Sequence, residues 1–358
     1  MNKTTRRGFI QQAATTIAGL ALCPSTILAK PRPIKIAIYA PSHCALPVVH
    51  AYYSDLYKKN GVHAEIVHCA GMPEVTQKLI SGQVDFAQVM TPMVFKMHFS
   101  QMNLPLVITQ TLGTNGGALG VASQSKIKKI QDLNGKRIGI HNPLMIHHLI
   151  LRLILEKYGL TKKNIQIVTV PMNQIESSLR SGATQAFIHP EPLPTFMESQ
   201  NIARSLLLTR MFWNNHPCCS LACKRSFFEK NQQLVEDFTH ATIMAGLKLD
   251  NIAMRQSEIE KVHSFDTPFK KFPLDRLQQA FQPRRSDFYP FPFLSAGYVV
   301  VEQMKKAQLL PQTIDTKKSV KNVIQADLAM KILKNVAGHI PGTSVPTSNE
   351  RKETFQLI

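Results

Sequence analysis

The residues best suited to chemistry in this sequence are histidines that follow short apolar runs. His43, His141 and His189 each stand just after such a run, in a stretch typical of a loop. A neutral imidazole donates and accepts hydrogen bonds, and a protonated one adds positive charge, around an unperturbed pKa of ~6.5. If the three line one cleft, its affinity for an anion should strengthen as the pH falls below about 6.5. These positions therefore predict a histidine-lined ligand site.

A metal site is the alternative that the same residue types raise. His141, His147 and His148 are close in sequence, but the last two are adjacent on a predicted helix and point apart, without the i, i+4 spacing of a two-ligand face. Five cysteines follow residue 29, so at least one thiol is unpaired: Cys44, Cys69, Cys218, Cys219 and Cys223. The last three could bind a metal or form one bridge, although buried structural thiols are commoner. We expect no metal and no cofactor.

Composition and motifs narrow the function further. The sequence contains none of four common enzyme motifs: Gly-x-Ser-x-Gly, the phosphate loop, His-Glu-x-x-His and the dinucleotide-binding fingerprint. The formal charge of +19 is compatible with nucleic acid, an anionic membrane surface or an anionic ligand. The basic residues are scattered instead of clustered with aromatic residues, which argues against nucleic acid. The length of 358 residues suits about two domains.

Two stretches, 79–92 and 179–192, share one arrangement: a helix closed by glycine, a short apolar strand, and a polar loop with a proline. Glycine past a helix end accepts positive φ, and proline cannot continue a strand. Such a unit builds parallel α/β sheets, in which ligands bind beyond the carboxyl ends of the strands. Two units facing each other predict an α/β fold of two similar lobes with a cleft between them.

The remaining sequence supplies further strands and helices around these two units. An extended stretch at 118–123 could carry the chain to a second lobe, and the residues from about 339 on are rich in Pro, Gly, Ser and Thr. The predicted organisation is a signal at 1–29, a first lobe at 30–122 with 225–338, a second lobe at 123–224, and a loose C-terminal tail at 339–358. Strands are expected at 34–39, 62–69, 104–110, 138–140 and 165–170, and helices near 231–254, 274–281, 295–307 and 320–336.

The first 29 residues predict export. Thr-Thr-Arg-Arg-Gly-Phe-Ile at 4–10 resembles a twin-arginine signal, and the apolar stretch at 17–22 is far shorter than the ~20 residues of a membrane span. Cleavage after Ala29 would release a soluble periplasmic protein that the twin-arginine translocase has carried across the membrane. Cys23 raises the alternative of a lipoprotein anchor, but Leu22 stands where a small residue is expected.

This order of segments resembles type II periplasmic solute-binding proteins of ABC importers. The local matches resemble the nitrate/bicarbonate branch, with sulfonate and thiamine-precursor binders as cousins. The resemblance implies a two-lobed fold, capture of a small solute that is expected to be anionic, and an ABC permease partner in the inner membrane. Six matches run in order from about residue 34 to 335: 42–45, 81–93, 114–116, 187–192, 211–217 and 290–296.

Three positions depart from the pattern of that branch. Ala296 stands in place of its lysine, Leu193 in place of an aromatic residue, and His43 in place of an aspartate. Loss of a buried lysine would weaken the binding of a small anion by several kcal/mol. The resemblance therefore implies the fold and the role, but not nitrate as the ligand.

In a clamp of this type, a few polar groups on strand-end loops recognise the solute, and hinge motion closes the lobes over it. Loop Asn, Ser and Thr also bond the nearby backbone routinely, so we expect about half of the candidates to touch the solute. The nine predicted ligand-binding residues are Ser42, His43, Gln88, Thr91, Asn115, His141, Asn142, His189 and Glu191.

Two other functions are compatible with this fold. A ligand sensor that signals to a membrane receptor would have the same sequence features as a transport component. A thiamine-pyrimidine synthase of this fold carries a dense cysteine motif, which 218–223 echoes only faintly, and an export signal argues against a cytosolic biosynthetic role. We therefore expect the binding protein of an importer and not an enzyme.

Overall fold

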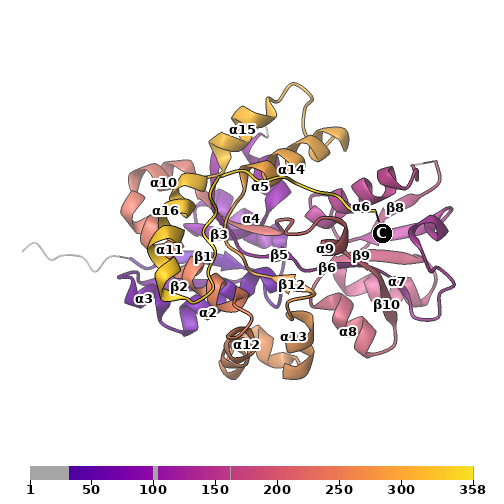
Figure 1. The fold of residues 1–358 in the computed structure, drawn as a ribbon, viewed down its shortest axis with the longest axis horizontal. Helices are drawn as coiled ribbons and strands as arrows, with labels where there is room; N and C mark the ends of the chain where they lie inside the picture. The colour runs from indigo at the N-terminus through magenta and orange to yellow at the C-terminus, as the bar shows by residue number, and fades with distance from the viewer. Residues whose placement is uncertain (1–31, 100–103, 162, 358) are drawn as a thin grey trace, which may run out of the picture. The chain divides into compact units, whose positions relative to one another are not determined.

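The structure, a computed structural model, describes residues 32–99, 104–161 and 163–357. The predicted export signal at 1–29 lies outside the described residues. The chain from Pro33 on forms one compact unit. In its described part, strands form two five-stranded sheets and one two-stranded sheet, and helices pack against the two larger sheets (Figure 1). The predicted α/β class is confirmed.

The first sheet combines strands from distant parts of the chain: β1 (Ile34–Ile38), β2 (Ala64–His68), β3 (Phe86–Met90), β4 (Leu106–Thr111) and β11 (Cys219–Lys224). Its order is β2-β1-β3-β11-β4. β1 runs parallel to β2 and β3, whereas β11 runs antiparallel to β3 and β4. The long helix α11 (Gln232–Asp250) packs on this sheet, where the rings of Phe238 and Phe86 stack with centroids 4.3 Å apart.

The second sheet comes from one continuous stretch: β6 (Gly117–Ala122), β7 (Arg137–Ile140), β8 (Gln166–Thr169), β9 (Ala186–Pro190) and β10 (Ala203–Leu208). Its order is β10-β6-β9-β7-β8. β7 runs parallel to β8 and β9, and β6 runs antiparallel to β9 and β10. Each sheet therefore sets three parallel strands beside an antiparallel one in the same relative order. This confirms the two similar halves that the repeated unit predicts.

The chain crosses between the sheets near β5 (Thr114–Asn115) and again between β10 and β11. β5 pairs with β12 (Ser286–Asp287) in the two-stranded sheet. By strand pairing, β6 belongs to the second sheet and β11 to the first. The predicted lobe boundaries at 122 and 224 fall at the last residues of these two strands and remain a proposal.

In the repeated unit, the glycine predicted after each helix is confirmed, but the polar loop predicted after the first strand is not. Gly82, just after α4, has φ 76° and Gly182, after α7, has φ 71°, the left-handed backbone that glycine adopts at little cost. The polar loop predicted after the first strand is wrong, because α5 begins at Thr91 with Pro92 in its first turn. Proline suits that turn, where its missing N–H is not needed.

Among the residues that the structure describes, no helix combines the length and the apolar character that a membrane crossing needs. The other helices are α2 (Leu46–Tyr53), α3 (Leu56–Lys59), α4 (Met72–Ser81), α5 (Thr91–His98), α6 (Ile146–Lys157), α7 (Ile175–Arg180), α8 (Leu193–Ser199), α9 (Thr209–Phe212), α10 (Arg225–Lys230), α12 (Arg255–Ser264), α13 (Leu274–Ala280), α14 (Leu294–Lys306), α15 (Thr316–Val323) and α16 (Ala326–Val336). Short 3-10 turns are η1 (His43–Ala45), η2 (Ile130–Leu133), η3 (Met172–Gln174), η4 (Pro268–Lys271) and η5 (Ala337–His339).

The C-terminal segment, 339–358 in the predicted organisation, makes specific contacts in its described part. The N–H of Leu294, at the start of α14, donates to the Asn349 carbonyl at 2.9 Å. The indole Nε1 of Trp213, which follows α9, donates to Glu353 at 2.7 Å. The segment is thus held both to α14 and to the part of the chain that leaves the second sheet.

Candidate ligand-binding site

A cavity of about 210 Å³ lies at the carboxyl ends of strands from both sheets. Its wall takes residues that follow β1 and β7, and residues at the ends of β3 and β9. The starts of α4, α6 and α8 complete it, through Met72, Ile146 and Leu193. A parallel α/β arrangement offers this place to a ligand, because the strand-to-helix connections meet there.

Six of the nine predicted ligand-binding residues line this cavity: Ser42, His43, Gln88, His141, His189 and Glu191. The other three satisfy neighbouring groups elsewhere. The Thr91 hydroxyl donates to a backbone carbonyl at 3.1 Å, and Asn142 Oδ1 accepts from a backbone N–H two residues on at 2.8 Å. Asn115 Nδ2 donates to Asp287 at 2.6 Å. For the six that line the cavity, contact with a solute remains a prediction.

The nine predicted ligand-binding residues are all polar, so the prediction missed the apolar and sulfur-bearing part of the wall. One signal was available: Met72 and Met145 each stand where a helix begins after a strand, the position at which side chains reach a ligand. Leu193 lines the cavity, whereas Ala296 lines a separate space of about 20 Å³. The additional lining residues used below are Met72, Met90, Met145, Met172, Phe196, Phe272, His147, Cys44, Cys218 and Cys219.

Gln88 fixes the loop that follows β1. Its Oε1 accepts from the Tyr39 N–H at 3.1 Å, and its Nε2 donates to Ser42 Oγ at 3.0 Å. The Ser42 hydroxyl in turn donates to the Tyr39 carbonyl at 3.0 Å. Gln88 and Ser42, both predicted to bind the ligand, are therefore hydrogen-bonded to each other. Together they position the loop that carries His43.

Glu191 is a buried carboxylate in the cavity wall. It accepts from Arg285 Nε at 2.7 Å and from the Thr195 N–H at 3.2 Å, while Arg285 Nη1 donates to Glu198 at 2.7 Å. Burial raises the pKa of Glu191, and the adjacent Arg285 guanidinium opposes that rise. The remaining guanidinium nitrogen, Nη2, is buried without a hydrogen-bond partner. The ion pair offsets the charge of Glu191 and anchors the connection between β9 and α8.

Burial lowers the pKa of the histidines that line the cavity. The pKa of His189 falls to about 4, and the pKa values of His43 and His141 lie below the usual value. Nδ1 of His189 lies 2.9 Å from the Pro190 carbonyl, so Nδ1 carries the proton and Nε2 is a bare acceptor. At pH 7 these imidazoles are neutral. The positive charge expected of them therefore develops only in more acidic solution.

Two ring nitrogens of the cavity histidines, His141 Nδ1 and His189 Nε2, are buried without a hydrogen-bond partner. Buried polar atoms nearly always have such a partner, because an unmade hydrogen bond costs roughly 1–3 kcal/mol. A bound molecule with its own donors and acceptors would satisfy these nitrogens. His148 belongs elsewhere, with Nδ1 2.8 Å from the Pro143 carbonyl, as expected for a helix neighbour that points away from His147.

Glycines at the crossing near β5 make room for two of these rings. A Cβ at Gly116, where φ is 59°, would lie 2.5 Å from His43 Nε2. A Cβ at Gly117 would lie 2.3 Å from His147 Nε2. Both distances are far below normal contact, so the Asn-Gly pattern at Asn115 and Gly116 serves the packing of the cavity histidines.

Residues 29–262, more than half of the chain, match the model of the NMT1-like family. The chain belongs to this family. The bicarbonate-binding protein CmpA of Synechococcus elongatus is 21% identical in an alignment 374 positions long, which covers 88% of this chain and 81% of CmpA. The nitrate import ATP-binding protein NrtC of Synechocystis is 22% identical over 204 residues, which cover 52% of this chain but 30% of NrtC.

Solved structures place this NMT1-like protein in a known fold. The periplasmic nitrate-binding protein NrtA of Synechocystis superposes with a TM-score of 0.78 at 20% identity, over 90% of this chain and 93% of NrtA. The two-lobed fold of periplasmic binding proteins is therefore confirmed, as is the predicted resemblance to the nitrate and bicarbonate type.

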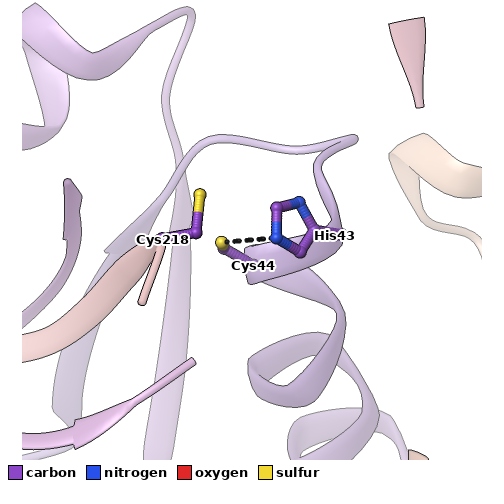
Figure 2. Close-up of side chains that lie close together, drawn as sticks. All are labelled: His43, Cys44 and Cys218. Atoms are coloured by element: carbon purple, nitrogen blue, oxygen red, sulfur yellow. Dashed lines mark hydrogen bonds between the residues drawn. The ribbon is translucent and has the colours of Figure 1, made fainter. Parts of the chain in front are cut away.

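A cluster of potential metal ligands lies in the wall of the cavity of this NMT1-like protein. One donor atom each from His43, Cys44 and Cys218 lies within 4.8 Å of the others, and all three residues are buried. Figure 2 shows the Cys44 sulfur directed at the His43 ring, where Sγ and Nε2 are 3.4 Å apart. Burial raises the pKa of Cys44 well above its usual value, whereas hydrogen bonds from Cys218 and Cys44 lower that of Cys219.

Proposed function

We propose that this protein is the exported solute-binding component of an ABC importer and that it captures a small organic anion. The observation that carries the proposal is the cavity at the strand ends of two similar sheets, lined by histidines with unpartnered nitrogens. CmpA and NrtA, by name bicarbonate-binding and nitrate-binding, support the transport role. Its partners would be an ABC permease of the inner membrane and, during export to the periplasm, the twin-arginine translocase.

The anionic head of the solute would be held without a lysine or arginine, since the described residues that line the cavity include neither. Helices α4 and α6 begin at the cavity wall, whereas the start of α8 is already occupied by the Glu191 carboxylate, which accepts from the Thr195 N–H. A helix N-terminus carries the equivalent of about half a positive charge and free N–H groups, which favour an anion. Imidazole N–H groups would add hydrogen bonds, and acidic solution would strengthen them.

The rest of the solute would be apolar. Methionines, Phe196, Phe272 and Leu193 form much of the wall, and a bare inorganic anion would leave them unused. The volume of about 210 Å³ is below the ~300–1,000 Å³ of pockets for drug-sized ligands. A short-chain sulfonate or carboxylate combines the required head, tail and size.

A thermal-shift panel tests the solute class. Short alkanesulfonates and carboxylates are compared with nitrate, bicarbonate and pyrimidine precursors of thiamine on the purified chain. A solute at 100 times its Kd adds about 2.7 kcal/mol, which raises the melting temperature by roughly 5–10 °C. We expect that shift from an organic anion. A larger shift from nitrate or bicarbonate would contradict the organic tail, and a shift from pyrimidine precursors alone would contradict the anion.

A second experiment separates the importer from a sensor, and from an enzyme of the same fold. In proteoliposomes that hold the permease, the solute-loaded protein should stimulate ATP hydrolysis and solute uptake, and the solute should be recovered unchanged. Binding without stimulation would favour the sensor. A chemically altered solute would contradict the non-catalytic role.

A further inference from the structure

The cluster of His43, Cys44 and Cys218 has the geometry of a metal site. Cys44 Sγ and His43 Nε2 are 3.4 Å apart, and all three donor atoms lie within 4.8 Å of one another. Ligands at ~2.0–2.3 Å from a shared ion, as for zinc in proteins, are roughly 3.3–4.0 Å from one another. Small side-chain rotations would therefore bring the three donors onto one ion.

The backbone holds these donors together from distant parts of the sequence. His43 and Cys44 form the turn η1 after β1. Cys218 immediately precedes β11, which is inserted between β3 and β4, and its N–H donates to the Gly113 carbonyl at 2.9 Å. Gly116 leaves the space that the His43 ring occupies. The donor arrangement is therefore built by the sheet and its crossing, not by a mobile loop.

The donor types select the class of metal. Two sulfurs and one imidazole suit soft or borderline ions, whereas calcium and magnesium take oxygen ligands, of which this cluster has none. Zinc sites with three protein ligands are known, but zinc usually has four ligands in closed sites. Four of the chain's 14 methionines line the same cavity: Met72, Met90, Met145 and Met172. Thioethers favour copper in its monovalent state.

We propose that His43, Cys44 and Cys218 bind Cu(I), with Nε2 of the histidine and the two thiolates as ligands. The two thiol protons pass to solvent on binding, and the oxidation state of the ion does not change. The four methionines line the same cavity as the cluster. This proposal goes beyond solute import and does not depend on it.

The test is a competitive titration of the reduced, full-length chain with Cu(I) under anaerobic conditions, with bathocuproine disulfonate as the competing chelator. We expect one Cu(I) per chain and a thiolate-to-copper absorption band in the ultraviolet. Cys44→Ser, Cys218→Ser and His43→Gln should each weaken the affinity at least tenfold, because even indirect partners of a metal ligand change affinity ~10–100-fold.

Cys69→Ser and Cys223→Ser are matched controls, since both residues are buried cysteines outside the cluster. They should leave the Cu(I) affinity unchanged. Circular dichroism and the melting temperature of each metal-free variant separate loss of a ligand from loss of the fold. Equal Cu(I) affinity in the folded Cys44→Ser and Cys218→Ser variants would overturn the proposal.

Two further outcomes would overturn the copper assignment. One is a parallel titration in which Zn(II) binds and Cu(I) does not, and in which Zn(II) binding is lost when any of the same three residues is substituted. The other is a thiol count on the unreduced chain that shows a stable Cys44–Cys218 disulfide, confirmed by peptide mass. The solute panel uses other ligands, so failure of the import proposal and failure of the copper proposal are distinguishable.

Discussion

At the scale of single residues, His189 makes the acid sensitivity of the cavity measurable. Its pKa is about 4 in the folded protein, because burial disfavours the charged ring, against ~6.5 when unfolded. The unfolded state therefore takes up the proton first, and stability falls as the pH drops from about 6.5 to about 4, by up to roughly 3 kcal/mol. His189→Gln should reduce this loss, measured by urea unfolding at pH 7.5 and pH 5, while the buried His43, His147 and His216 still contribute losses of the same sign. His63→Gln, at an exposed position, is the control. If His189→Gln lost as much stability between pH 7.5 and pH 5 as the unaltered protein, the assignment of this loss to His189 would be contradicted.

The same proton should affect solute binding with the opposite sign. Nε2 of His189 is a bare acceptor at pH 7 and must gain a proton before it can donate to an anion. Anion affinity should therefore rise as the pH falls toward about 4, by at most tenfold per pH unit for one proton, and level off below about 4. Calorimetric titrations with the best organic anion at pH 7.5 and pH 5.5 check this. An affinity independent of pH in the unaltered protein would argue that the histidines stay neutral.

The Arg285–Glu191 pair gives a third prediction at this scale. Arg285→Met leaves the buried Glu191 carboxylate without its partner, which typically costs about 3–5 kcal/mol. The double variant with Glu191→Gln should recover much of that loss, because the fully buried carboxylate is then gone; Glu198, the second partner of Arg285, is partly exposed and still accepts from the Ser205 N–H. Arg180→Met is the control, since its pair with Glu176 is exposed and worth under ~1 kcal/mol. Equal losses from both arginine variants would contradict a structural role for the buried pair.

At the scale of elements, the crossing near β5 positions the cavity through its glycines. Gly116→Ala combines a strained φ of 59° with a Cβ only 2.5 Å from His43 Nε2. Strain and overpacking should together cost roughly 2–5 kcal/mol, and displacement of the ring should weaken solute binding. Gly135→Ala, with φ 74° but open space around it, isolates the strain and should cost about 1–2 kcal/mol without affecting binding. If Gly116→Ala and Gly135→Ala lost equal amounts of stability and of solute affinity, the contact between residue 116 and His43 would be unimportant.

The elements also show what sequence could predict. The repeated units around Gly82 and Gly182 were predictable because a helix, its glycine stop and the next strand are local patterns. The cluster of Cys44 with Cys218 was not, because it depends on the insertion of β11 between β3 and β4, and pairing across such a separation leaves no local pattern. Strand-end polar residues were good candidates for the cavity. Whether one reaches it or bonds the backbone, as Asn142 does, depends on side-chain direction.

At the scale of the whole molecule, the C-terminal segment ties two distant regions together through one carboxylate. Glu353 accepts from Trp213 Nε1 at 2.7 Å and from Ser295 Oγ at 2.9 Å. Trp213 follows the second sheet in the chain, whereas Ser295 lies in α14. A composition of small, polar and charged residues predicts a loose tail, because it does not specify which partners the side chains find.

This tie is testable because Trp213 is the single tryptophan of the chain and is buried. Glu353→Leu removes the acceptor of two buried donors, so we expect a loss of about 1–3 kcal/mol in unfolding free energy. Fluorescence emission should shift to longer wavelength as water reaches the indole. Glu350→Leu, in the same segment but bonded to Tyr298 at the surface, should change stability by under ~0.5 kcal/mol and leave the emission in place. If the two variants behave alike, the segment does not tie these regions, and solute-induced closure would have to be limited by the crossings near β5 and between β10 and β11 alone.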